Sequence, residues 1–260
     1  MTYNDIEIQK LIDIALNAGT AIMEVYQRNF SVETKDDKSP LTEADRKSND
    51  VILNGLKQHY PSIPFISEEV KQMPYSERKS WTRLWLIDPL DGTKEFIKKN
   101  GEFTVNIALI ENGVPVLGVV YAPAFDKGYV GIKGEGSFSF SSSDTELKSI
   151  HAGLHYSQLN TVKVVGSRSH LSEETVQFVD NLKAQGKEVD FVSSGSSLKI
   201  CLVAEGKADV YPRFGPTMEW DTAAAHTVAL YAGKNVLQYP ENTPLVYNKE
   251  NLLNPWFIVE

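Results

Sequence analysis

A ten-residue stretch at positions 84–93, Leu-Trp-Leu-Ile-Asp-Pro-Leu-Asp-Gly-Thr, constrains the fold more than any other part of the sequence. Its four leading apolar residues predict a short buried β-strand. Asp88 precedes a proline, and a proline disfavours the helical region for the residue before it, so we expect the strand to end there. Thr93 is then placed to begin a helix. A strand, a tight turn and a helix start therefore follow one another within one short segment.

Asp88 and Asp91 flank the predicted turn, and carboxylates on either side of a tight turn can face one point. Asp before Pro and Asp before Gly are also ordinary turn formers, so the spacing alone leaves both interpretations open. Gly92 favours a site, because glycine lets the backbone approach an anion and a helix beginning at Thr93 directs free N–H groups toward it. No His or Cys cluster accompanies these acids, which favours Mg²⁺ over Zn²⁺ as a bound ion.

The overall charge and the cysteine content exclude several classes of protein. The 260 residues carry a net charge of −8, which argues against a nucleic-acid partner and against general affinity for anionic membranes. No apolar run approaches the ~20 residues of a membrane-spanning helix. Cys201 is the only cysteine, so the chain cannot form an internal disulfide, and this indicates a reducing compartment. We expect a cytoplasmic protein and leave peripheral association with the cytoplasmic face of the inner membrane open; the sequence does not give the oligomeric state.

Hydrophobic periodicity predicts an α+β first half. We expect helices over residues 4–28, from 42 to Pro61, and over 93–99. Strands are expected at residues 63–66, 84–87, 103–111, 115–121 and 128–133. Polar segments at 35–40 and 70–80 predict loops, the second of them mobile. Turn signals at Asn112-Gly113 and at 126–128 make the last three strands an antiparallel meander.

The second half alternates strands with helices, which predicts α/β layering. The expected strands lie at residues 162–165, 189–192 and 208–211, and the helices at 172–185, 197–205 and 221–232. A serine-rich connection at 139–145 marks a boundary. We therefore expect an α+β domain over residues 1–145 and an α/β domain over 146–260, both contributing to one cleft.

Further acids lie at the ends of predicted elements, where functional sites are usually built. Glu68 and Glu69 follow a strand, Asp45 opens the second helix and Asp221 opens the last one. Each has an ordinary structural explanation: a solvated turn for the two glutamates, a helix N-cap for Asp221, and a first-turn acid favoured by the helix dipole for Asp45. Their shared position at element ends connects them with Asp88.

Four motifs together resemble the signatures of the inositol monophosphatase superfamily. They lie at residues 42–45, 67–69, 85–93 and 220–224, occur in the family's order and span nearly the whole chain. Ser67 and Ala225 depart from the pattern, because the family often has glycine at these positions. The resemblance implies a layered αβαβα, sugar-phosphatase-like sandwich and a Mg²⁺-dependent, lithium-sensitive phosphatase.

Other segments are closer to the bacterial 3′(2′),5′-bisphosphate nucleotidase branch of this superfamily. They lie at residues 92–97, 101–106, 195–199 and 211–217. The resemblance to this branch implies a small-molecule substrate, adenosine 3′,5′-bisphosphate, which is hydrolysed to AMP and phosphate in support of sulfate assimilation. Inositol monophosphate and fructose 1,6-bisphosphate remain alternative substrates. A non-catalytic nucleotide-sensing module remains an alternative of another class.

The resemblance also assigns roles to single residues. It implies two or three Mg²⁺ ions and in-line attack of an activated water on the phosphate. The implied metal ligands are four carboxylates and one backbone carbonyl: Glu68, Asp88, Leu90, Asp91 and Asp221. Asp45 and Thr93 are implied as the hydrogen-bonded pair that orients and deprotonates the water, and Glu68 counts with them as a catalytic residue.

Substrate contacts are expected from both halves of the chain. The first half offers the N–H groups of Gly92 and Thr93 and the carboxylate of Asp91, and the second half offers Asp221. A serine-rich helix start and two cations are expected to bind the rest of the nucleotide: Gly195, Ser196, Lys199 and Arg213. Residues 167–170 form a further polar loop, in which His170 receives no catalytic role.

Overall fold

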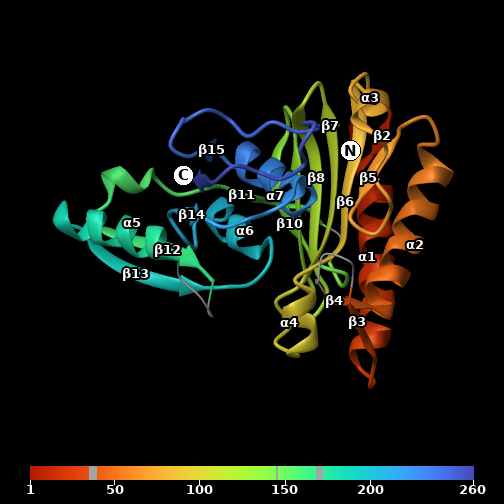
Figure 1. Cartoon of the computed structure of the whole chain (residues 1–260), viewed down its shortest axis with the longest axis horizontal. Coiled ribbons are helices and arrows are strands. Elements are labelled where there is room, and N and C mark those ends of the chain that lie inside the picture. Colours follow the sequence, from red (N-terminus) through yellow and green to blue (C-terminus); the bar gives the residue numbers. More distant parts are fainter. Residues whose placement is uncertain (35–39, 145, 168–171) are drawn as a thin grey trace.

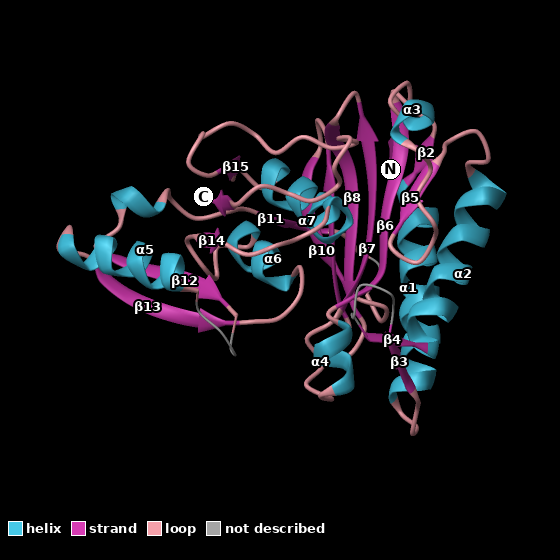
Figure 2. Cartoon of the chain, in the orientation of Figure 1, coloured by secondary structure: helices cyan, strands magenta, loops and turns pink. Residues whose placement is uncertain are grey.

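The computed structural model describes residues 1–34, 40–144, 146–167 and 172–260, which form stacked layers of helices and sheets (Figures 1 and 2). The largest layer is a seven-stranded sheet with the order β11-β10-β9-β8-β7-β6-β5. Its strands are β5 (Phe65–Ser67), β6 (Arg83–Asp91), β7 (Thr104–Glu111), β8 (Val114–Ala122), β9 (Lys127–Ile132), β10 (Gly136–Phe140) and β11 (Lys148–Ile150). Neighbouring strands are antiparallel except β5 and β6, which are parallel.

Helices cover both faces of this sheet. The helices α1 (Ile8–Tyr26) and α2 (Glu43–His59) lie on one face, and α7 (Glu219–Tyr231) lies on the other (Figure 1). Trp85 and Ile87 of β6 belong to the apolar core shared with α1 and α2, whereas Leu84 and Leu86 belong to the core shared with α7. Successive side chains of a strand point to opposite faces, so a continuous apolar run is buried on both sides.

The second half of the chain builds the remaining layers. β12 (Thr161–Gly166) pairs in parallel with β13 (Glu188–Ser193). β14 (Tyr211–Arg213), β16 (Phe257–Val259) and β15 (Val236–Gln238) form an antiparallel sheet in that order, and a bridge between Val164 and Val210 joins it to β12. α6 (Leu198–Ala204) shares its core with α7, and α5 (Glu173–Ala184) covers the outer side (Figure 1).

Short elements complete the described chain. β1 (Thr2–Tyr3) pairs with β2 (Ile6–Glu7), and β3 (Val32–Thr34) pairs with β4 (Pro40–Thr42). The remaining helices are α3 (Tyr75–Arg78), α4 (Thr93–Ile97) and a 3₁₀ turn at Tyr156–Gln158. Within the described ranges, every helix is too short or too polar to cross a membrane.

The predicted layered αβαβα class and the antiparallel meander are confirmed, with several differences in detail. The first helix begins at Ile8 rather than at residue 4, because the β1–β2 hairpin precedes it. β6 does not end at the Asp-Pro pair but continues to Asp91, and its pairing with β7 is irregular between Asp88 and Asp91. The last predicted strand, at 208–211, lies too early, since β14 begins at Tyr211.

Other differences concern loops and short strands. α3 forms inside the segment 70–80 that was expected to be an irregular loop, and Pro40 belongs to β4, whereas residues 35–39 of the other predicted loop lie outside the described residues. The strands β10, β11, β15 and β16 are absent from the prediction. The domain boundary at residue 145 stays a prediction; β11, which follows it, still pairs with β10 of the large sheet.

The close contact between β8 and α7 gives a test of the packing that holds α7 in place. A Cβ atom at Gly118 would lie 2.5 Å from the Ala224 carbonyl oxygen and 2.8 Å from Thr227 Oγ1. We expect Gly118→Ala to lower the free energy of unfolding by ~1–3 kcal/mol, because α7 has to move. Urea unfolding measures the change. Gly153→Ala is the matched control, since the nearest atom there is 4.0 Å away, and an equal effect of both substitutions would contradict the close-packing argument.

Candidate active site

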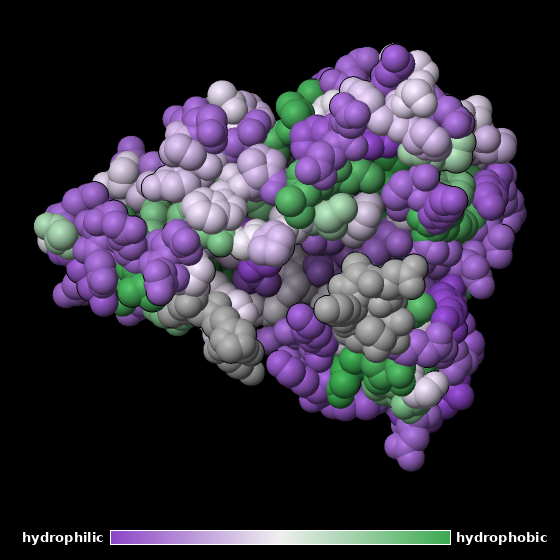
Figure 3. Space-filling view, viewed as in Figure 1, coloured by the Kyte–Doolittle hydropathy of each residue, from purple (hydrophilic) through white to green (hydrophobic). Residues whose placement is uncertain are grey.

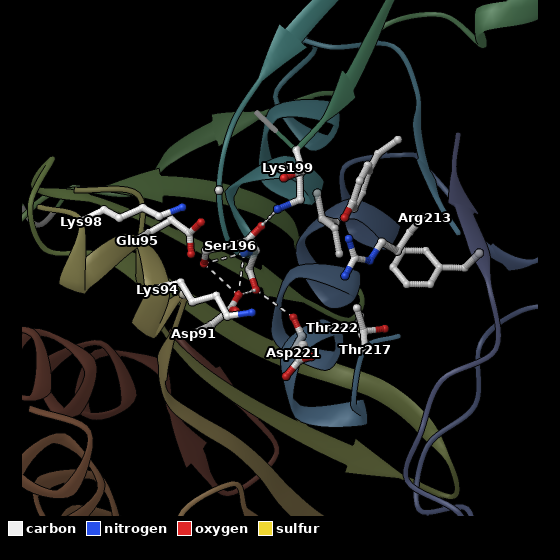
Figure 4. Close-up of a pocket in the computed structure, with 17 residues that line it drawn as sticks. Asp91, Lys94, Glu95, Lys98, Ser196, Lys199, Arg213, Thr217, Asp221 and Thr222 are labelled. Carbon is white, nitrogen blue, oxygen red and sulfur yellow. Dashed lines mark hydrogen bonds between the residues drawn. The ribbon is translucent and has the colours of Figure 1, made fainter. Parts of the chain in front are cut away.

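Two cavities lie where the end of β6, the start of α4 and the starts of α6 and α7 meet. Their volumes are about 450 and about 420 Å³, and both are lined by Asp91, Gly92 and Asp221. Figure 3 shows a recess between the lobe that carries α5 and the lobe that carries α1 and α2, bordered largely by hydrophilic residues. Figure 4 shows the larger cavity. Of the charged residues, Glu68 and Asp88 line only the smaller of the two cavities, and Lys98, Lys199 and Arg213 line only the larger, so the two are described in turn.

Five acidic residues line the smaller cavity: Glu95 of α4 and four acids from the predicted motifs. Glu68 follows β5, Asp88 and Asp91 lie in the last part of β6, and Asp221 lies in the first turn of α7. The parallel pairing of β5 with β6 brings Glu68 to this place, and its N–H donates to the Ile87 carbonyl at 3.1 Å. The structure therefore brings together the acids that the sequence motifs single out.

Asp88 is the most deeply placed of these acids and is 1 % exposed. Burial, together with the charges of Glu68, Asp91 and Asp221, raises the pKa of the Asp88 carboxyl well above its usual value. Burial and the neighbouring Asp91 also raise the pKa of Asp221 well above its usual value. A buried carboxylate among like charges is unfavourable unless a proton or a cation neutralises it. The electrostatics of this cavity therefore favour a cation.

The carboxylate oxygens of the cavity fit Mg²⁺, and Leu90, whose backbone carbonyl the family resemblance implies as a further ligand, also lines the cavity. Asp88 Oδ1 is held within the loop, where it accepts a hydrogen bond from the Leu90 N–H at 3.0 Å. In the part of the chain that the structure describes, no three His, Cys, Asp or Glu side chains are gathered closely enough to hold an ion as they stand. The chemistry of the donors supports a cation site, whereas a finished ligand shell is not present.

Asp45 uses its two carboxylate oxygens for different tasks. Oδ2 accepts hydrogen bonds from the N–H (2.7 Å) and the hydroxyl (2.6 Å) of Thr42, and Ala44 N–H donates to that hydroxyl, which closes a capping box at the start of α2. Oδ1 accepts from Thr93 Oγ1 at 3.2 Å. The Asp45–Thr93 hydrogen bond that the family resemblance implies is therefore present, together with the structural role of a first-turn acid.

Asp221 is the third residue of α7 and not its N-cap, which corrects the structural explanation offered from the sequence. The N-cap is Met218, whose N–H donates to Asp221 Oδ2 at 2.8 Å. Because Asp221 lies in the first turn of α7, its carboxylate is at the positive end of the helix dipole. This placement lets Asp221 stabilise the helix start and line both cavities at once.

Asp91 joins the two halves of the molecule. Its Oδ2 accepts hydrogen bonds from Ser196 Oγ (2.8 Å), Ser197 N–H (2.7 Å) and Ser197 Oγ (2.8 Å) at the start of α6. Ser196 has a φ of 55°, in the left-handed region, and its Oγ also lies 2.6 Å from Thr104 Oγ1. Figure 4 shows the hydrogen bond between Ser196 and Asp91 beside Asp221. The serine-rich segment therefore fixes Asp91 in addition to lining the larger cavity.

Gly92 provides the backbone approach that the sequence predicts. Its φ is 92°, and it stands immediately before α4, which begins at Thr93. A side chain at Gly92 would also crowd the Glu102 carbonyl oxygen (3.1 Å) and the Ser196 Cβ atom (3.3 Å). Glycine is therefore required here both by conformation and by space. Gly92 and Thr93 both line the smaller cavity, where an anion can reach the start of α4.

The larger cavity is lined by four cationic side chains. Lys199 is buried, its Nζ donates to the Ser196 carbonyl at 2.8 Å, and burial lowers its pKa to about 8. Arg213 donates through Nη2 to the Pro216 carbonyl at 3.0 Å, while its buried Nε has no hydrogen-bond partner among the described residues. Lys94 of α4 and Lys98, which follows α4, lie on the opposite side of the cavity (Figure 4).

Lys94 and Lys98 are absent from the predicted site, and their place at this cavity follows from the fold. Gly195, Ser196, Lys199 and Arg213, which were predicted, all line this cavity. Arg168, Ser169 and His170 of the predicted polar loop lie outside the described residues, and Ser167 lines the cavity.

The family of the chain follows from comparison with known proteins. The model of the inositol monophosphatase family matches residues 5–256, so the chain belongs to this family. Its members are metal-dependent phosphatases, generally with Mg²⁺. The oxygen-donor cavity described above is consistent with that chemistry.

The chain is also similar to individual proteins of this family. The chain is 45 % identical over 254 residues to the 3′(2′),5′-bisphosphate nucleotidase CysQ of Salmonella typhimurium, covering 97 % of this chain and 98 % of that protein. A solved structure of CysQ from Bacteroides thetaiotaomicron has a TM-score of 0.85 and 47 % sequence identity, covering 97 % of this chain and 96 % of the other. A Thermotoga maritima IMPase, at a TM-score of 0.76 and 24 % identity over 97 % of this chain and 91 % of the other, shares the fold.

Replacing Asp88 tests the electrostatic description of the smaller cavity. Asn at this position keeps an acceptor for the Leu90 N–H but removes one buried charge from the acid cluster. We expect Asp88→Asn to melt at a higher temperature than the wild type in metal-free buffer, because like-charge repulsion is relieved. We also expect its Mg²⁺-dependent phosphate release to fall by at least roughly 10²-fold.

Calorimetry and a phosphate-release assay provide the two measurements. Asp50→Asn is the control, because Asp50 is an exposed acid of α2 that lines neither cavity. Full activity of Asp88→Asn would contradict the cation site, and a lower melting temperature would contradict the repulsion argument.

Proposed function

We propose that this chain is a Mg²⁺-dependent 3′(2′),5′-bisphosphate nucleotidase, which hydrolyses adenosine 3′,5′-bisphosphate to AMP and phosphate. The observation that carries the proposal is the junction of an acid-lined cavity with a cation-lined cavity. A substrate with two phosphates has one to be cleaved, at the acids, and one to be held, at the cations. Relatives at 45 % and 47 % identity that carry the CysQ name support this choice of substrate.

The acid-lined cavity is the proposed place of cleavage. Its donors, proposed to hold two or three Mg²⁺ ions, are Glu68, Asp88, the Leu90 carbonyl, Asp91 and Asp221. Mg²⁺ bound there would neutralise the carboxylates and polarise the oxygens of the phosphate. The N–H groups of Gly92 and Thr93, at the start of α4, would donate to the equatorial phosphate oxygens, where negative charge accumulates in the transition state.

Thr93 and Asp45 are the proposed pair that prepares the attacking water. Thr93 Oγ1 is held by Asp45 Oδ1 at 3.2 Å and lies 3.4 Å from the Leu90 carbonyl oxygen, so its lone pairs can accept from a water in the cavity. Asp45 accepts the proton that passes through the Thr93 hydroxyl. The water oxygen bonds to phosphorus as the ester bond to the nucleotide breaks, the departing oxygen takes up a proton from solvent, and Asp45 afterwards releases its proton to solvent.

The cation-lined cavity would hold the second phosphate. Arg213 presents a buried Nε without a partner among the described residues, and Lys199 is a buried cation whose charge is destabilised by burial. A phosphate would satisfy the first and stabilise the second. Lys94 and Lys98 would add charge from the α4 side (Figure 4). Gly195 and Ser196 would bring backbone and hydroxyl groups to the same ligand.

The cellular location stays a prediction. Cys201 is buried, and burial raises the pKa of its thiol, so it behaves as a small apolar side chain. This is consistent with the cytoplasmic location expected from the sequence.

Specificity constants for three substrates test the proposed function. We expect kcat/KM for adenosine 3′,5′-bisphosphate to exceed those for AMP and inositol 1-phosphate, and phosphate release to require Mg²⁺. Arg213→Ala should lower kcat/KM for the bisphosphate by about 10–100-fold, as for loss of a hydrogen bond to a charged group, and change the constant for inositol 1-phosphate little. Arg28→Ala, at an exposed arginine paired with Glu43, is the control.

Two outcomes would overturn the proposal. Equal constants for the bisphosphate and for inositol 1-phosphate would favour an inositol phosphatase. Phosphate release that is absent with Mg²⁺ for all three compounds would favour a non-catalytic module.

The pKa of Lys199 predicts how substrate affinity depends on pH. Burial lowers this pKa to about 8, so the free enzyme carries the Lys199 charge below pH 8 and loses it above that pH. A bound phosphate favours the charged form. We therefore expect KM for the bisphosphate to rise above about pH 8. Initial rates between pH 6 and 10 on wild type and Lys199→Arg provide the measurement. Arginine stays charged throughout, so a pH-dependent rise in KM that persists in this variant would exclude Lys199 as its source.

A further inference from the structure

One face of α2 contacts three separate segments of the candidate active site. Asp45, Ser48 and Asn49 occupy positions i, i+3 and i+4 of the helix, which lie on the same side. All three are buried polar residues, at 1 %, 0 % and 7 % exposure. Only Asp45 has a role in the chemistry proposed above. The other two polar side chains point into the protein at places where apolar residues would satisfy packing alone.

Ser48 connects α2 with the last part of β6, which carries several of the proposed metal ligands. Its Oγ donates to the Pro89 carbonyl at 2.7 Å. Pro89 stands between Asp88 and Leu90, at the point where the pairing of β6 with β7 is irregular. A proline carries no N–H, so its carbonyl is the backbone group through which this residue can be fixed by hydrogen bonding. The contact therefore restrains the segment between two proposed ligands.

Asn49 connects the same helix face with the turn that carries Glu68. Its Oδ1 accepts from Ser67 Oγ at 2.7 Å, and both residues are buried. The turn is closed by a hydrogen bond from the Val70 N–H to the Ser67 carbonyl at 3.2 Å. Gln72 Nε2 donates to the Ser67 carbonyl (2.6 Å) and to the Val70 carbonyl (2.8 Å). Ser67 is therefore held from both sides, and Glu68 follows it directly.

We infer that Ser48 and Asn49 are positioning residues of the cation site, which fix the Asp88–Leu90 loop and the Glu68 turn relative to the Asp45–Thr93 pair. Helix α2 acts as a rigid support, because three contacts along one helix face cannot shift independently. The inference rests on the metal ligands named in the proposed function. It also gives a reason for serine at position 67, since a glycine there has no hydroxyl to donate to Asn49.

Residues that hold the ligands of a metal by hydrogen bonds typically contribute roughly 10–100-fold to metal affinity or activity. We therefore expect Ser48→Ala and Asn49→Ala each to raise the Mg²⁺ concentration needed for half-maximal activity by about 10-fold. KM for the bisphosphate at saturating Mg²⁺ should change little, because neither residue lines the cation-lined cavity. Asn54→Ala is the matched control, since Asn54 is an exposed asparagine on the same helix.

A measurement without substrate separates positioning from a general loss of stability. The melting temperature is recorded over a Mg²⁺ titration, and the apparent dissociation constant follows from the dependence of stability on ion concentration. The variants should need about 10-fold more Mg²⁺ to reach the same rise in melting temperature. A lower melting temperature with an unchanged Mg²⁺ dependence would mean that both residues serve packing alone, and it would overturn the inference.

The hydrogen bond itself is tested by a double-mutant cycle. Ser67→Ala, Asn49→Ala and the double variant are compared in the same Mg²⁺ titration. If the Ser67–Asn49 contact carries the effect, the double variant needs no more Mg²⁺ than either single variant. If the effects of the two single substitutions on the Mg²⁺ requirement add fully in the double variant, the effect does not arise from this contact. A wild type that shows no Mg²⁺-dependent stabilisation and no phosphate release would instead contradict the proposed function, which keeps the two failures distinguishable.

Discussion

The hydrogen bonds from the start of α6 to the Asp91 carboxylate are the contacts on which the rest of the site depends. A single carboxylate oxygen at the end of strand β6 accepts from two serines of the second half. Ser197 Oγ also lies 2.8 Å from the Asp221 carbonyl oxygen, so its single hydroxyl proton has two acceptors within reach, and the N-terminal turn of α7 adjoins the same network. Lys199 follows two residues later. The acid-lined and cation-lined cavities adjoin because this network sets their shared wall.

The same arrangement keeps the carboxylates close together, where their like charges repel one another. Asp88 lies on a strand paired on both sides and buried on both faces, so its carboxylate cannot move away from its neighbours by a backbone shift. Such unfavourable repulsion between carboxylates persists only when the surrounding structure holds the groups in place, and it is typical of functional sites. In this molecule the surroundings are the apolar cores on the two faces of the large sheet. The core therefore maintains the charge cluster that a cation neutralises.

Local patterns in the sequence predict most of the helices, the meander and the order of the site motifs, because these features depend on residues close together in the chain. The short strands β10, β15 and β16 escape prediction, since three to five residues give too little periodicity. Lys98 and Asn49 escape it for another reason. Lys98 lines a cavity together with Ser196, and Asn49 forms a hydrogen bond with Ser67; both partners are far away in the sequence, and only the folded chain brings them near.

The structural and the functional explanations of the acids turn out not to be alternatives. Asp45 and Asp221 are each the third residue of a helix, and each accepts a hydrogen bond from the N-cap N–H through Oδ2. The positive end of a helix dipole stabilises the charged form of such a carboxylate, which offsets part of the repulsion from the neighbouring acids. Asp88 and Asp91 have no helix of their own and depend instead on a loop N–H and on the serines of α6. Each of these four aspartates is thus held by a donor that has a structural purpose, and for this reason each one, seen alone in the sequence, looks like an ordinary cap or turn.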